Sequence, residues 1–182
     1  QRVERHDKTA AVLNFMWFRG ETRHPVDVPL LLKMFPGEKF SPQVLGPKVL
    51  GLADFTASKI PGRDEHLQAT GGITRRFGFH DETTSEYLLH LSTADPFPEF
   101  TLAYFPNNDF VSHKQGPAEA LQTVQEVDEH LAKFIESRNG LDSFLSEFAI
   151  FILGDHSQCD MLRDNGGRGI QMDELLDDYQ IA

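Results

Sequence analysis

Four residues in two short segments have side chains that could bind metal. Asp109 and His113 are separated by three residues, and Asp155 and His156 are adjacent. Neutral imidazoles and carboxylates form a mixed nitrogen and oxygen ligand set, which suits Zn²⁺ and also Mn²⁺ or Fe. A multi-cysteine zinc motif is excluded, because Cys159 is the only cysteine in the chain. We therefore predict that these four side chains are metal ligands.

The two pairs could serve one ion or two. Asp109 and His113 are separated by three residues, so a loop that carries both could wrap around one ion. Gly154 relaxes the backbone enough for the side chains of Asp155 and His156 to turn towards the same region. Alternatively, each pair binds its own ion, since two ions a few ångströms apart are common in phosphate chemistry. A purely structural alternative also stays open, in which Asp109 and Asp155 are turn or helix-cap residues.

The elements expected around these residues would bring the two pairs together. Apolar runs predict strands at residues 100–105 and 149–153, and apolar residues at helical spacing predict a long helix at 118–137. With a polar loop at 106–117, this order is a β-α-β unit of a parallel sheet. Ligands of open α/β sheets bind beyond the carboxyl ends of the strands. Both pairs are therefore expected at the same sheet edge.

The rest of the chain predicts shorter elements, and prolines interrupt the stretch from residue 21 to 81. The expected elements are a buried strand at 9–18, a short helix at 26–34, a strand or covering turn at 49–55, a helix at 83–91 with Asp81 as its N-cap, and a short helix at 141–148.

Composition indicates one soluble globular domain. The chain has 182 residues, of which 40% are hydrophobic and 25% charged, and no apolar run approaches the ~20 residues that span a bilayer. Its net charge of −11 argues against a surface that coats polymeric nucleic acid. The polar N-terminus is neither a signal peptide nor a membrane anchor. Since the chain begins with Gln1, we expect the natural protein to begin further upstream.

Two motifs resemble one known family. The segment FTLAYFPNNDFVSHKQGP (residues 100–117) is similar to the strand and D-x-x-x-H-x-x-G-P loop of type I phosphodiesterase/nucleotide pyrophosphatase proteins. The segment FILGDHSQ (151–158) resembles that family's strand ending in Asp-His-Gly. The helix between them and AVLNFMWFRGETRH (11–24) are also similar. The resemblance implies an alkaline-phosphatase-like fold, a three-layer α/β/α sandwich with a mostly parallel sheet, incomplete in this chain.

The resemblance also implies a function, that of a two-metal hydrolase of small phosphate esters or nucleotides. Asp109 and His113 would bind one ion with a later His, and Asp155 and His156 the other with an earlier Asp. Zinc would be the metal, with Mn or Fe as alternatives. The nucleophile would be a Thr or Ser upstream of this chain.

Departures from the family pattern qualify this expectation. No histidine follows His156, and Ser157 stands where the family has glycine. We therefore expect residues 1–182 to be one partial domain, truncated at both ends, inactive alone but cut from an active parent. The alternative is a non-catalytic metal-binding or interaction domain derived from the same fold. Within the chain, Thr56 could be the nucleophile or a turn or cap residue, and Arg19 could bind phosphate or pair with a nearby surface acid.

Overall fold

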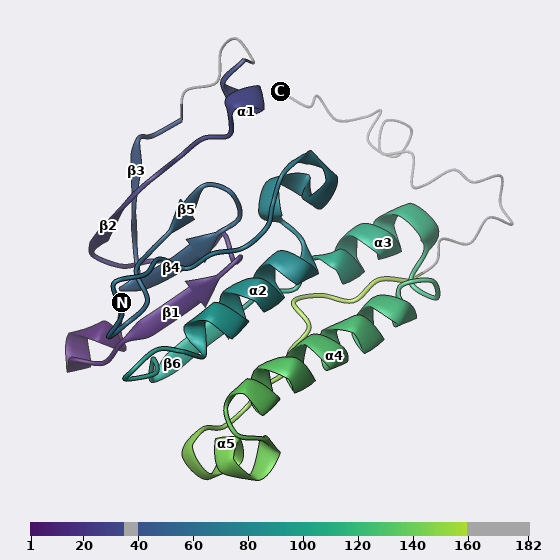
Figure 1. The fold of residues 1–182 in the computed structure, drawn as a ribbon. Helices are drawn as coiled ribbons and strands as arrows, with labels where there is room; N and C mark the ends of the chain where they lie inside the picture. Colours follow the sequence, from purple (N-terminus) through teal and green to yellow (C-terminus); the bar gives the residue numbers. More distant parts are fainter. Residues whose placement is uncertain (35–39, 160–182) are drawn as a thin grey trace, which may run out of the picture.

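A four-stranded, mostly parallel sheet forms the centre of the computed structural model, which describes residues 1–34 and 40–159 (Figure 1). Its strand order is β5-β4-β1-β6. Both β4 and β6 run parallel to β1, whereas β5 is antiparallel to β4. The strands are β1 (Ala10–Leu13), β4 (Val49–Leu52), β5 (Thr56–Ala57) and β6 (Phe100–Ala103). The predicted α/β class with a mainly parallel sheet is confirmed.

The central strand β1 is shorter than the predicted strand at 9–18. Its four residues are all buried, as expected for a strand covered on both faces. The chain then turns at Asn14, which adopts a positive φ of 58°. The Asn14 side chain donates to the Gly78 carbonyl (2.8 Å) and accepts from the Ala53 N–H (2.8 Å). Trp17 beyond this turn is 83% exposed, so the apolar run leaves the sheet there.

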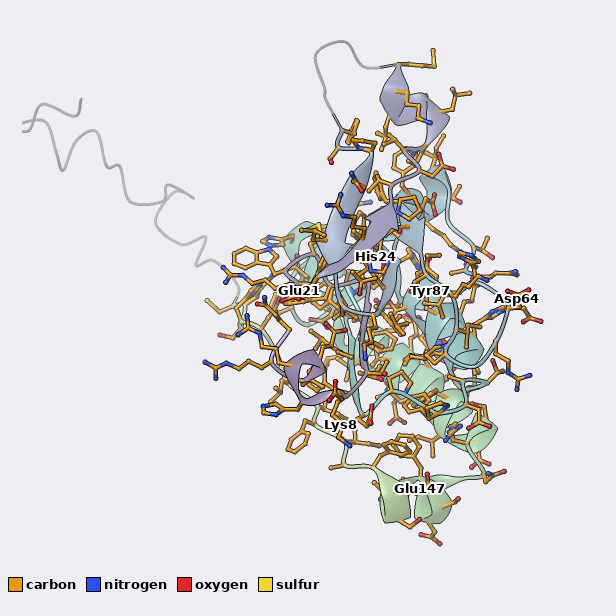
Figure 2. The ribbon with its side chains drawn as sticks, turned by 90° about the vertical axis from the view of Figure 1, so that its left-hand side faces the viewer. Lys8, Glu21, His24, Asp64, Tyr87 and Glu147 are labelled. Carbon is orange, nitrogen blue, oxygen red and sulfur yellow. The ribbon has the colours of Figure 1, made fainter. Side chains whose placement is uncertain are left out.

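Helices pack on this sheet and on one another. Helix α2 (Asp81–Leu91) contacts β1, and α4 (Leu121–Ser137) contacts α2 (Figure 1). The core includes Leu13 from β1, Tyr87 from α2 and Phe134 from α4. Figure 2 shows Tyr87 inside the fold, whereas Asp64 and Glu147 lie at its periphery. Elsewhere in the described residues, the helices are α1 (Leu30–Lys33), α3 (Asn107–Gln115), α5 (Leu141–Glu147) and the 3₁₀ segments Glu4–His6 and Ile73–Gly78.

A second, two-stranded sheet consists of β2 (Thr22–Pro25) and the antiparallel β3 (Gln43–Gly46). His24 in β2 is buried, and its Nε2 lies 2.7 Å from the Pro47 carbonyl oxygen. His24 therefore has a structural role. In the part of the chain that the structure describes, no helix has the length and apolar character needed to cross a bilayer.

The predicted loop at 106–117 is wrong, because most of it forms the nine-residue helix α3. The Asp81 carboxylate accepts a hydrogen bond from the Asn107 N–H (2.8 Å) at the start of this helix. Gly116, with a φ of 98°, ends it. Asp81 is thus not the N-cap of α2 as predicted; His80 occupies that position, and Asp81 supports α3 instead.

The predicted strand at 149–153 is also wrong. The segment runs from α5 towards α3 without pairing with any strand of the described chain (Figure 1). Phe151, Ile152 and Leu153 are 82%, 76% and 87% exposed. An apolar sequence favours a strand only where a neighbouring backbone supplies hydrogen-bond partners. Such a neighbour is absent from residues 1–34 and 40–159 at this position.

Candidate metal centre

Helix α3 places the first predicted pair on one helical face. Asp109 and His113 are four residues apart, a spacing that makes side chains neighbours on a helix. The Asp109 Oδ1 atom lies 3.4 Å from His113 Nε2. The pair therefore meets through helical geometry and not through a loop that curls around an ion.

The second predicted pair joins the first from a distant part of the sequence. His156 Nε2 lies 3.7 Å from Asp109 Oδ1 and 3.8 Å from Asp155 Oδ1. The backbone N–H of His156 also donates to Asp155 Oδ1 (2.9 Å), which fixes the turn after Gly154. All four predicted residues thus form one cluster, although the second pair does not follow a strand.

Two further residues of the cluster were missed by the sequence interpretation. The Tyr104 hydroxyl, just after β6, lies 3.5 Å from Asp155 Oδ2, and Gln158 Nε2 donates to Asp109 Oδ1 (2.8 Å). The position of Tyr104 at the end of an apolar run beside the first motif was the available signal. Gln158 lies two residues after His156, but no spacing in the sequence marks a glutamine amide as part of a metal site.

The cluster has a negative electrostatic character. Partial burial, followed by the nearby carboxylates of Asp155 and Asp109, raises the pKa of Tyr104. The Tyr104 side chain therefore stays protonated and can donate to Asp155. Asp109 is the least exposed of the four at 32%, whereas the side chains of His113, His156 and Asp155 are 70%, 56% and 52% exposed. A cation can reach this surface cluster from solvent.

The donor types fit a divalent metal, but the donor set is incomplete. Two atoms that coordinate the same tetrahedral ion, each about 2.1 Å from it, lie about 3.4 Å from each other. This separation is close to the 3.4 and 3.7 Å between Asp109 Oδ1 and the imidazole nitrogens of His113 and His156. However, among residues 1–34 and 40–159 no three His, Cys, Asp or Glu side chains are arranged to hold one ion. The pairwise geometry suits a partial site that needs further ligands.

The other candidates from the sequence do not join the cluster. Thr56 is buried on β5, at the sheet edge opposite β6, and its hydroxyl has no hydrogen-bond partner in the described structure. Arg19 is exposed.

Comparison with known proteins gives the family. The model of the family "Type I phosphodiesterase / nucleotide pyrophosphatase" matches residues 1–181. The chain belongs to this family. A 2,3-bisphosphoglycerate-independent phosphoglycerate mutase from Helicobacter hepaticus is 30% identical over 69 residues, which cover 38% of this chain and 13% of the mutase. No solved structure gives a significant match.

Members of this family share a general chemistry. The family consists of phosphoric ester hydrolases that act on small phosphoesters and generally depend on metal. The predicted family is thereby confirmed.

Proposed function

We propose that this chain is part of a phosphodiesterase or nucleotide pyrophosphatase that uses two divalent metal ions, with zinc as the resident metal. The observation that carries the proposal is the position of Asp109, whose Oδ1 lies 3.4 and 3.7 Å from the imidazoles of His113 and His156. These histidines come from segments far apart in the sequence. Family membership, which brings general metal dependence, supports the same conclusion.

Asp109, His113, Asp155 and His156 would hold the metal ions in this proposal. Bound divalent cations would neutralise the phosphate oxygens, which otherwise repel an attacking nucleophile. The chain's own side chains would orient these ligands. Gln158 donates to the Asp109 carboxylate and Tyr104 to that of Asp155, and such hydrogen bonds fix how a carboxylate presents its remaining lone pairs.

We place the nucleophilic Thr or Ser and the remaining ligands outside this chain. The incomplete donor set of the described residues supports this assignment, as does the short share of the mutase that the chain matches. The substrate would be a small phosphodiester or a nucleotide pyrophosphate. We therefore expect the isolated chain to bind metal without hydrolysing a substrate, whereas the parent protein is active.

Metal content tests this proposal directly. The chain would be loaded with Zn²⁺ or Mn²⁺, desalted and measured by elemental analysis, alongside the variants His113→Ala and Asp155→Ala. Both variants should retain clearly less metal than the wild type, because each loses a direct ligand. The matched control is His6→Ala, which removes an exposed histidine near the N-terminus and should retain wild-type metal.

Turnover of a p-nitrophenyl phosphodiester separates the remaining alternatives. Bound metal without turnover is the expected result for the isolated chain. Equal metal content in wild type, His113→Ala and Asp155→Ala would refute the ligand assignment. A wild-type chain that binds no metal under any loading condition would favour the alternative of an interaction domain derived from this fold.

A further inference from the structure

A second polar cluster contacts the first turn of α3, the helix that carries Asp109 and His113. The buried Asp81 carboxylate accepts a hydrogen bond from the Asn107 N–H (2.8 Å), and Arg76 donates from Nη2 to the Asn107 side-chain oxygen. The Arg76 guanidinium also lies over the Phe110 ring, 3.9 Å from its centroid. Two side chains from outside α3 therefore hold both its backbone and its first-turn side chains.

The backbone around Arg76 adopts an unfavourable conformation. Arg76 and Phe77 have positive φ values of 50° and 55°, which are unfavourable for residues with a Cβ atom. Gly78 follows at 92°, and a Cβ atom there would lie 2.7 Å from the Cα of Ala53. Arg76 Nε donates to the Phe79 carbonyl (2.9 Å), which fixes the guanidinium plane. Such a conformation persists where surrounding contacts maintain it. The contacts of Arg76 with Asn107 and Phe110 of α3 are among them.

Asp81 is an unusual residue to bury at this position. It is 1% exposed, and its Oδ2 atom has no hydrogen-bond partner within the described structure. Glu82 on α2 and Glu126 on α4 add negative charge near it, whereas Arg76 offsets that charge. A buried carboxylate with one free oxygen costs stability. The hydrogen bond from the Asn107 N–H to Asp81 Oδ1 offsets part of this cost.

From these contacts we propose that Arg76 and Asp81 are positioning residues, which clamp α3 so that Asp109 and His113 face the 155–156 segment. Neither residue is placed in direct contact with the metal. Instead, the clamp sets the orientation of the helix on which two of the four ligands stand. This inference rests on the proposed metal site, but the clamp itself has a consequence that needs no metal, namely the local order of α3.

Amide hydrogen exchange of the full chain tests the clamp without metal. Arg76→Ala and Asp81→Ala should speed exchange in α3 at least tenfold relative to α4, which serves as the internal reference. Asp81→Asn keeps an acceptor for the Asn107 N–H and should exchange like the wild type. Phe110→Leu, which removes a half-exposed ring under the guanidinium, gives a milder variant if Arg76→Ala does not fold. The matched control is Arg75→Ala, since Arg75 bonds Thr70 and Glu86 instead of α3.

Mn²⁺ titration of the same variants then connects the clamp to the site. Arg76→Ala should weaken Mn²⁺ binding about 10–100-fold, the usual cost of losing a residue that orients metal ligands, while Arg75→Ala binds as the wild type does. Unchanged α3 exchange in Arg76→Ala, Asp81→Ala and Phe110→Leu would overturn the clamp whether or not metal binds. Loosened α3 with unchanged Mn²⁺ affinity would overturn the positioning role. Absence of Mn²⁺ binding by the wild type would instead refute the proposed function, and α3 exchange alone would then decide on the clamp.

Discussion

Single side chains decide how the candidate site is built. Asp109 is the residue on which the cluster converges, because its carboxylate contacts a histidine of its own helix, a histidine of the 155–156 segment and the Gln158 amide. Tyr104 extends the cluster towards β6 through Asp155. A carboxylate with several partners is held in one orientation, so changes in these partners should alter metal affinity without removing a ligand.

Tyr104→Phe tests this at the residue scale. The variant removes the hydroxyl near Asp155 but keeps the ring, which packs edge-on against Phe15 at 5.8 Å. We expect Zn²⁺ affinity to fall several-fold with little change in the urea midpoint of unfolding, as measured by calorimetric titration and denaturation. Unchanged affinity would show that the Tyr104–Asp155 contact has no part in the site.

Asp81 gives a pH-dependent prediction. Burial, more than any other influence, raises the pKa of its carboxyl from 3.8 to about 7. The native state therefore binds this proton more tightly than the unfolded state. The stability that the protonated form contributes is fully present below pH 3.8 and is lost as pH rises through 7.

Asp81→Asn should remove the loss of stability that accompanies ionisation of Asp81, because an asparagine side chain does not ionise. The free energy of unfolding of the variant should exceed that of the wild type at pH 8, by an amount on the order of a few kcal/mol, and the difference should shrink steadily as pH falls towards 4. Urea denaturation of both proteins across this range measures it. A difference that is independent of pH would contradict the raised pKa of Asp81.

Individual elements show where sequence patterns succeed and where they fail. Helix α4 was predictable, because its apolar residues recur at helical spacing and form a stripe. Helix α3 was not, since NNDFVSHKQ has no such stripe, and the Asp81 contact that supports its start is non-local. The motifs gave the four ligand candidates, but neither pattern nor spacing could reveal that Tyr104 and Gln158 join them.

The C-terminal end of α3 gives a prediction at the element scale. Gly116 ends the helix with φ 98° and ψ 158°, a conformation essentially restricted to glycine. Gly116→Ala should therefore destabilise the chain by about 1–3 kcal/mol, as measured by urea denaturation. Gly154→Ala is the matched control, because a Cβ atom there meets only ordinary contacts, the nearest at 3.8 Å. Equal effects of the two variants would contradict the role of Gly116 in ending α3.

At the scale of the whole molecule, the unpaired segment at 149–153 is the main departure from the predicted fold. Its apolar sequence predicted a buried strand, but its side chains are largely exposed. Burial in a sheet also requires a partner strand, which a local pattern cannot supply. Exposed apolar side chains on a segment with unpaired backbone hydrogen-bonding groups promote association between chains. The isolated chain should therefore self-associate as its concentration rises.

Ile152→Lys should suppress that association, because it places a charge in the middle of the exposed run. Sedimentation velocity at several concentrations would show it as a shift towards the monomer. Leu45→Lys adds the same charge at an exposed position of β3 and should leave association unchanged. A wild-type chain that stays monomeric at all concentrations would contradict the prediction.

The contact between Asp109 on α3 and His156 joins two segments whose intervening chain forms α4 and α5. An ion held by both would act as a removable cross-link, since it would close that stretch into a loop and restrict the unfolded chain as a disulfide does. Chelation would then loosen α4 and α5, which contain none of the ligands. The supply of metal would then influence the folding of this chain.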